Sequence, residues 1–133
     1  MKVLIVDDDE DVQTFLSNCV ETTGCDHIDL AGTGEMALGL SVQHAYDLVT
    51  LDVMMPGASG IDIISVVRGM MPWAVIALIS GYTEEVTDQA REYADVVLPK
   101  PVNVVTIQKL VELTRELMVK RQAIRDLGTE TER

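Results

Sequence analysis

Five polar side chains stand directly after short apolar runs at four separate points of the chain. They are Asp7, Asp8, Asp52, Ser80 and Lys100. Three carboxylates held close together repel one another unless a cation compensates them, and a small set of hard oxygen ligands suits Mg²⁺. A lysine and a hydroxyl beside such a site would bind the oxygens of a phosphoryl group. Asp52 would then be the nucleophile, as carboxylates are in aspartyl-phosphate chemistry.

Each of these residues also has a purely structural interpretation. Asp52 precedes a Met-Pro-Gly turn, and aspartate is common before turns. The run Asp7 to Asp9 could simply cap the helix that follows, with more acids than a cap needs. Ser80 and Gly81 could form an ordinary turn, and Lys100 could be a surface lysine. The coincidence of all four features at one place in a fold favours the chemical interpretation.

The pattern of apolar residues predicts the elements that position these side chains. Short apolar runs predict five strands, and apolar residues at helical spacing predict five helices between and after them. The predicted strands are Lys2–Val6, His27–Ala31, Tyr46–Asp52, Ala74–Ile79 and Asp95–Leu98, and the predicted helices are Glu10–Thr22, Thr33–Gln43, Ile61–Arg68, Glu84–Tyr93 and Val104–Leu127.

This alternation predicts an α/β fold, a doubly wound five-stranded parallel sheet with helices on both faces. Parallel strands bring their carboxyl ends to one edge, where open α/β sheets bind ligands. The polar residues that follow the strands are therefore expected to share one crevice. Trp73 precedes a strand and is expected at the opposite edge, in a packing role.

Composition excludes several classes of partner. The chain has 133 residues, with 22 acidic and 10 basic side chains and a net charge of −12, so a nucleic-acid partner is not expected. No apolar stretch is long enough to cross a membrane, and the amino terminus turns acidic at once, unlike a secretory signal. Cys19 and Cys25 lack metal-ligand spacing and predict reduced thiols in a cytoplasmic protein.

The last predicted helix is longer than the domain needs. From Val104 to Leu127 it would span roughly 36 Å, against roughly 17–20 Å for a core strand. We therefore expect a domain over residues 1–119 and, over 120–133, an extension of the helix with a tail frayed after Gly128. Apolar steps of three and four predict a short coiled-coil seam for a homodimer or a connector to an output domain, and a solvated tail is the alternative. The seam residues are Leu113, Leu117, Lys120, Ile124 and Leu127.

The sequence resembles response-regulator receiver domains, the phospho-accepting half of two-component signalling. The resemblance covers about residues 2 to 118 and rests on four motifs in order: VLIVDDD, DLVTLDVMMPGASGID, LISGY and LPKP. It implies a flavodoxin-like strand order 2-1-3-4-5. It also implies a phosphohistidine donor, either a histidine kinase or a phosphotransfer protein. A receiver is not an enzyme acting on other molecules, since it accelerates only its own phosphorylation and dephosphorylation.

The resemblance implies a role for each site residue. Asp52 is the expected phosphorylated aspartate and, with Asp8 and the backbone carbonyl of Met54, a direct Mg²⁺ ligand. Asp7 is expected to reach the metal through water. Lys100 is expected to pair with a phosphate oxygen and to precede a cis peptide bond to Pro101. Ser80 is the expected switch hydroxyl.

The chain departs from the family pattern at Val97. Family members usually carry an aromatic residue there that swings inward on activation, so Tyr82 or a shift of the fourth helix would have to provide the read-out. Met54 and Tyr82 also occupy the two positions that, in the family, tune how fast the phosphate is lost. Two alternatives remain open: a degenerate receiver that only binds partners, and a metal-dependent phosphohydrolase. The phosphohydrolase usually needs a second acid two residues after the nucleophile, where this chain has Met54.

Overall fold

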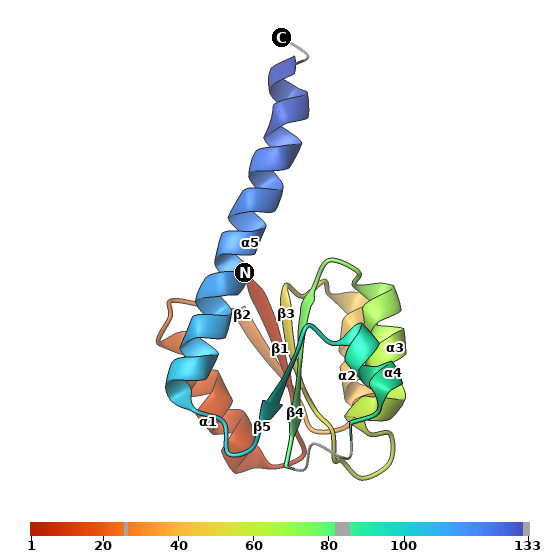
Figure 1. Ribbon diagram of the computed structural model, residues 1–133. Helices are drawn as coiled ribbons and strands as arrows, with labels where there is room; N and C mark the ends of the chain where they lie inside the picture. The colour runs from red at the N-terminus through yellow and green to blue at the C-terminus, as the bar shows by residue number, and fades with distance from the viewer. Residues whose placement is uncertain (26, 82–85, 132–133) are drawn as a thin grey trace.

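The computed structural model describes residues 1–25, 27–81 and 86–131, with side chains up to residue 128. Strands and helices alternate five times along these residues (Figure 1). The elements are β1 (Lys2–Val6), α1 (Glu10–Glu21), β2 (His27–Ala31), α2 (Gly34–Gln43), β3 (Leu48–Asp52), α3 (Gly60–Met70), β4 (Val75–Ser80), α4 (Asp88–Tyr93), β5 (Val96–Pro99) and α5 (Val104–Thr131).

The five strands form one parallel sheet in the order β2-β1-β3-β4-β5. This confirms both the predicted fold class and the strand order that the family resemblance implied. β3 lies at the centre and all five of its residues are buried, whereas β2 is an edge strand whose burial varies along its length. The central position of β3 brings its last residue, Asp52, between the ends of β1 and β4.

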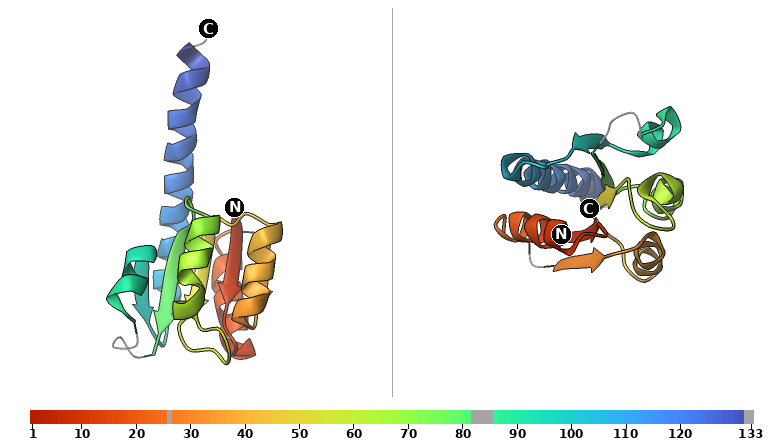
Figure 2. Two further views of the ribbon diagram at one scale, coloured as in Figure 1. Left: turned by 90° about the vertical axis from the view of Figure 1, so that its right-hand side faces the viewer. Right: turned by 90° about the horizontal axis from the view of Figure 1, so that it is seen from below.

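Helices cover the sheet on both faces, with α1 and α5 on one face and α2, α3 and α4 on the other (Figure 2). Successive residues of a strand point to opposite faces. Val3 and Ile5 of β1 therefore pack in the core beneath α1 and α5. Leu4 and Val6 pack in the core beneath the other three helices. α4 contributes one buried residue, Ala90, so it covers the sheet weakly.

Side-chain caps decide where several helices begin. Asp9 caps α1, the structural role that the sequence allowed for the run Asp7 to Asp9, since its carboxylate accepts the backbone N–H of Asp11 at 2.8 Å. The predicted start of α2 at Thr33 is wrong by one residue, because Thr33 is the N-cap and accepts the N–H of Met36. α3 begins at Gly60, before the predicted Ile61, because Ser59 and the third residue of the helix form a capping box.

The prediction that the fourth helix begins at Glu84 fails where the structure can test it. Val86 and Thr87 are not helical, and the helix begins at Asp88 because the Thr87 hydroxyl accepts the N–H of Ala90 at 3.1 Å. Glu84 itself and Tyr82 lie outside the described residues. The boundaries of the other elements up to β5 shift by at most two residues from the prediction, and Gly24, shortly after α1, has a positive φ.

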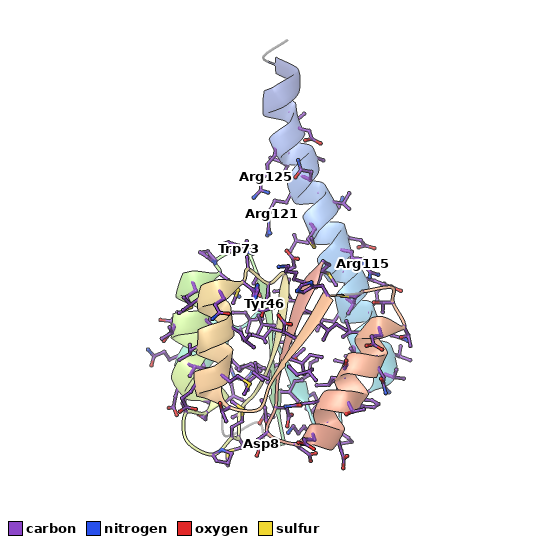
Figure 3. All side chains as sticks on the ribbon, turned by 180° about the vertical axis from the view of Figure 1, so that it is seen from behind. Asp8, Tyr46, Trp73, Arg115, Arg121 and Arg125 are labelled. Carbon is purple, nitrogen blue, oxygen red and sulfur yellow. The ribbon has the colours of Figure 1, made fainter. Side chains whose placement is uncertain are left out.

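Helix α5 continues to Thr131, four residues beyond its predicted end, and extends past the sheet (Figure 1). The extension lies at the edge of the sheet that carries Trp73, opposite the edge that carries Asp8 (Figure 3). Among the described residues, no helix combines the length and the apolar character that a membrane span requires. Cys19 and Cys25 are both buried and unpaired.

Candidate functional site

Strand β1 delivers two carboxylates to the carboxyl edge of the sheet. The apolar residues of β1 are buried up to Val6, where the strand ends. The acids that follow therefore lie at the edge of the sheet. Asp7 is 1% exposed, and its backbone is held by neighbouring elements: its N–H donates to the Ala31 carbonyl at 3.0 Å, and its carbonyl accepts from Gln13 Nε2 at 2.5 Å. The Asp9 N–H donates to Asp7 Oδ1 at 2.9 Å. The Asp7 carboxylate is therefore fixed in place, whereas Asp8 is exposed.

Strand β3 delivers the third carboxylate from the centre of the sheet. Asp52 is 1% exposed, and its Oδ1 accepts the N–H of Met54 at 3.3 Å. The start of α3 abuts the strand end here, because a Cβ on Gly60 would lie 2.3 Å from the Asp52 carbonyl oxygen. Only glycine can occupy that position with this backbone.

Lys100 bridges the two buried acids. Its ammonium lies 3.1 Å from Asp52 Oδ1 and 3.5 Å from Asp7 Oδ2. Its backbone N–H donates to the Ser80 carbonyl at 2.9 Å, which links the ends of β4 and β5. The peptide bond to Pro101 is cis, as the family resemblance implied.

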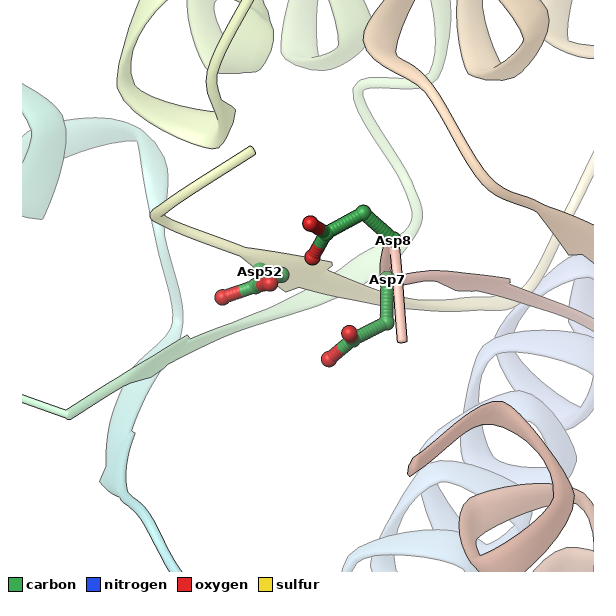
Figure 4. A group of neighbouring side chains, drawn as sticks. All are labelled: Asp7, Asp8 and Asp52. Atoms are coloured by element: carbon green, nitrogen blue, oxygen red, sulfur yellow. The ribbon is translucent and has the colours of Figure 1, made fainter. Parts of the chain in front are cut away.

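The three carboxylates lie close together at the strand ends (Figure 4). One oxygen from each of Asp7, Asp8 and Asp52 lies within 4.8 Å of the others. Asp7 Oδ2 and Asp52 Oδ2 are buried and accept no hydrogen bond from the described residues, although Asp7 Oδ2 lies within ion-pair distance of Lys100. Buried oxygens normally have partners. An oxygen-only set with one water-exposed member fits Mg²⁺, which binds a few carboxylates and keeps several waters.

The electrostatics of the site show the same need for a cation. Burial and the nearby Asp7 charge raise the pKa of Asp52 to about 6, although Lys100 and the Met54 N–H act in the other direction. Burial lowers the pKa of Lys100, but the hydrogen bond and charge of Asp52 and the charge of Asp7 outweigh it and raise that pKa overall. A single lysine leaves the three acids incompletely neutralised.

The remaining predicted site residues lie around this centre. Ser80 is buried at the end of β4, one residue beyond Ile79, the register partner of Asp52. Met54 is 60% exposed on the loop after β3, and its backbone N–H donates to Asp52. Val97 is half-buried against the core beneath α2, α3 and α4. Tyr82 lies outside the described residues.

Sequence reasoning missed one residue that shapes the site. Gln13, in the first turns of α1, donates to the carbonyl of Asp7 and, at 3.3 Å, to that of Ala31. Its side chain therefore joins the ends of β1 and β2 immediately behind the acids. The sequence did offer one indication that Gln13 lies near the site. Gln13 follows the Asp9 cap by four residues, and residues i and i+4 lie on one helix face.

The family model for the response regulator receiver domain matches residues 3–112. Among curated proteins, the transcriptional regulatory protein CpxR of Escherichia coli K12 is 36% identical over 124 residues, which cover 92% of this chain and 48% of CpxR. A cyclic di-GMP phosphodiesterase of Thermotoga maritima is 34% identical over 105 residues, 77% of this chain and 28% of that protein. The chain thus spans less than half the length of these relatives.

Solved structures show the same fold. The receiver domain of AraT, a response regulator from Geobacillus stearothermophilus, has a TM-score of 0.80 at 26% identity, covering 91% of this chain and 97% of that one. The response regulator TrrA from Thermotoga maritima, solved in complex with Mg²⁺ and BeF, has a TM-score of 0.74 at 33% identity, covering 88% and 99%.

Proposed function

Since the chain belongs to the family of response regulator receiver domains in two-component systems, we propose that it accepts a phosphoryl group on Asp52 from a phosphohistidine. The donor is a histidine kinase or a phosphotransfer protein. The observation that carries this proposal is the convergence of Asp7, Asp8 and Asp52 with Lys100 at one sheet edge. Phosphoryl transfer depends on positioning and charge stabilisation, and this group supplies both.

Each residue has a distinct part in the proposed reaction. Lys100 and the Met54 N–H engage Asp52 Oδ1, which leaves Oδ2 as the oxygen that attacks phosphorus. When bound, Mg²⁺ supplies charge neutralisation for the carboxylates and for the incoming phosphoryl oxygens. We assign its ligands to Asp8, Asp52 and the Met54 carbonyl, with Asp7 acting through water. The bond from phosphorus to the imidazole nitrogen breaks as the bond to Asp52 forms, and Lys100 binds a phosphoryl oxygen.

The signal leaves the site through the neighbouring strands. The new charge on Asp52 draws the Ser80 hydroxyl toward it, and α4 with β5 re-packs, a local charge event that biases a two-state element. Val97 replaces the usual aromatic of this switch, so the shift of α4 itself carries the read-out. The weak packing of α4 supports this proposal, because the helix buries a single residue and can therefore shift at low cost.

Intact-mass spectrometry tests the acceptor directly. The protein is incubated with Mg²⁺ and a small phosphodonor such as acetyl phosphate, and the expected gain is one phosphate. The Asp52→Asn variant is expected to gain none, and EDTA is expected to prevent the gain in the wild type. Equal labelling of wild type and Asp52→Asn would remove Asp52 as acceptor.

An apolar groove beside the site is the proposed docking place for the phosphodonor protein. It encloses about 640 Å³ and is lined by Asp11, Val12, Phe15, Leu16, Lys100, Pro101 and Val102. Phe15 is 43% exposed in it, and Lys100 at its rim contacts Asp52. A partner that covers this groove therefore places its phosphohistidine near the acceptor.

The two unpaired cysteines fit a reducing compartment, the cytoplasm.

The extension of α5 is the proposed output connection, either to a second copy or to an output domain. Leu113, Leu117, Ile124 and Leu127 are all exposed along it, at the spacing of a coiled-coil seam. Light scattering of the full chain and of a chain ending at Val119 tests the dimer. A higher mass for the full chain alone supports the seam, and monomers in both cases favour the connector.

A further inference from the structure

A second cavity lies at the amino edge of the sheet, opposite the acidic site, where α5 passes over the strand ends. It encloses about 380 Å³ and is lined by Asp47, Trp73, Met118, Arg121, Gln122 and Arg125. None of these residues belongs to the proposed phosphorylation site. Figure 3 shows Trp73 at the top of the sheet and the side chains of Arg121 and Arg125 reaching from α5 toward that side.

One residue that lines this cavity, Trp73, holds its indole ring in a fixed orientation. Trp73 Nε1 donates to the Tyr46 carbonyl at 3.1 Å, so the only polar atom of the ring is already satisfied. The residue remains 39% exposed. Large aromatic side chains usually bury more of their surface. A held ring with an exposed surface provides a stacking platform.

Two guanidinium groups lie on one side of α5, four residues apart. Arg121 is half-buried and donates from one Nη to the Trp73 carbonyl at 3.2 Å, which orders its side chain and leaves its other donors available. The Arg125 side chain makes no hydrogen bond or ion pair with any residue that the structure describes. This is unusual in a chain with 22 acidic and 10 basic residues.

The one acid of the cavity does not neutralise these arginines. Asp47 accepts the backbone N–H of Lys2 at 2.8 Å and forms no ion pair with Arg121 or Arg125. The cavity therefore carries two positive charges against one carboxylate that is already hydrogen-bonded. This net positive charge favours an anionic ligand.

We propose that this cavity binds a nucleotide, a phosphate ester that carries a flat ring. Guanidinium groups match phosphate in charge and geometry, which suits Arg121 and Arg125. A base stacks on an indole, which suits the exposed surface of Trp73. The cavity volume falls within the usual range for small-molecule sites. Inorganic phosphate alone would leave the indole of Trp73 without a stacking partner.

A nucleotide in this cavity would touch two parts of the molecule at once. Arg121 and Arg125 come from the start of the α5 extension, whereas Trp73 precedes β4 in the sheet. The bound ligand would therefore hold the extension against the domain. Because the site lies at the opposite edge from Asp52, both sites can be filled together.

Trp73 is the only tryptophan of the chain, so intrinsic fluorescence reports on this cavity directly. The full chain is titrated at low salt with AMP, GMP, CMP and UMP, and with adenosine and inorganic phosphate as the separate halves of the ligand. We expect saturable quenching by at least one nucleotide below about 1 mM, and weaker binding of adenosine and of phosphate. Equilibrium dialysis confirms the stoichiometry.

Arg125→Gln is the informative variant, because the Arg125 side chain is exposed and has no partner to lose among the described residues. Removing a charge-assisted hydrogen bond is expected to weaken nucleotide binding about tenfold to a hundredfold. Lys120→Gln removes the same charge from an exposed neighbour outside the cavity and is expected to change binding less than about twofold. No saturation by any nucleotide, equal losses in both variants, or phosphate binding as tightly as the nucleotides would each overturn the proposal.

Discussion

Replacing Asp52 by asparagine is expected to stabilise the metal-free protein at neutral pH while abolishing phosphorylation. Asp52 is 1% exposed, and its pKa rises to about 6 because burial and the Asp7 charge disfavour its ionised form. A group whose pKa is higher in the folded state than in the unfolded state stabilises the fold while it is protonated. That stability is lost as the pH rises through the folded-state pKa. Above pH 6, the ionised Asp52 therefore weakens the fold.

The size of the effect follows from the pKa. A rise from the ordinary value of 3.8 to about 6 corresponds to about 3 kcal/mol of lost stability at pH 7.5. Asparagine removes the charge but also the ion pair with Lys100, whose side chain is 31% exposed and can turn to water or to Asp7. We therefore expect Asp52→Asn to raise the free energy of unfolding by about 1 to 3 kcal/mol at pH 7.5.

Urea unfolding in EDTA at pH 7.5 and at pH 4.5 measures this gain. It is expected to shrink at pH 4.5, where the folded wild type already holds Asp52 protonated. Glu116→Gln, which neutralises an exposed acid on α5, is the control and is expected to stay within about 0.5 kcal/mol of the wild type at both pH values. With Mg²⁺ in place of EDTA the wild type is expected to gain about 2.7 kcal/mol at 100 times Kd, and the variant much less.

Two outcomes would refute this reasoning. If Asp52→Asn is no more stable than the wild type at pH 7.5, the buried carboxylates do not strain the metal-free fold. If the gain is the same at pH 4.5, its cause is something other than the ionisation of Asp52.

Four further substitutions test the packing and the metal site. Gly60→Ala places a Cβ 2.3 Å from the Asp52 carbonyl and is expected to cost about 1–3 kcal/mol in urea unfolding and to slow phosphorylation. Gly69→Ala, in the same helix with no atom within 4 Å, should instead gain about 0.5–1 kcal/mol, and equal effects would contradict the clash. Asp8→Asn is expected to weaken Mg²⁺ binding, measured by calorimetry, about tenfold or more with little change in metal-free stability, because Asp8 is exposed. Arg68→Gln removes two hydrogen bonds, to carbonyls at the end of α4 and just before β4, and one ion pair. We therefore expect the free energy of unfolding in urea to fall by about 2–4 kcal/mol. A loss below about 1 kcal/mol would contradict this role.

The sequence by itself determined the order of the elements and the ends of the strands that carry chemistry. Short apolar runs interrupted by acids are local signals, and they placed Asp7, Asp8 and Asp52 correctly at one edge of a parallel sheet. The alternation of strand and helix was sufficient to predict the fold class, because strands joined by helices pack as a parallel sheet with the helices on its faces. Among the described residues, errors in the predicted elements were confined to helix and strand boundaries, where caps such as Thr87 and Ser59 decide the first turn.

Only the tertiary structure decided which distant residues meet. The bond from Gln13 to the Asp7 carbonyl, the contact between Gly60 and the end of β3, and the approach of Arg121 to Trp73 join segments that carry no shared local pattern. Such contacts depend on how helices lie across the sheet. Periodicity specifies which face of a helix is apolar, but not which side chain of another element it will meet, because that depends on the packing of the whole core.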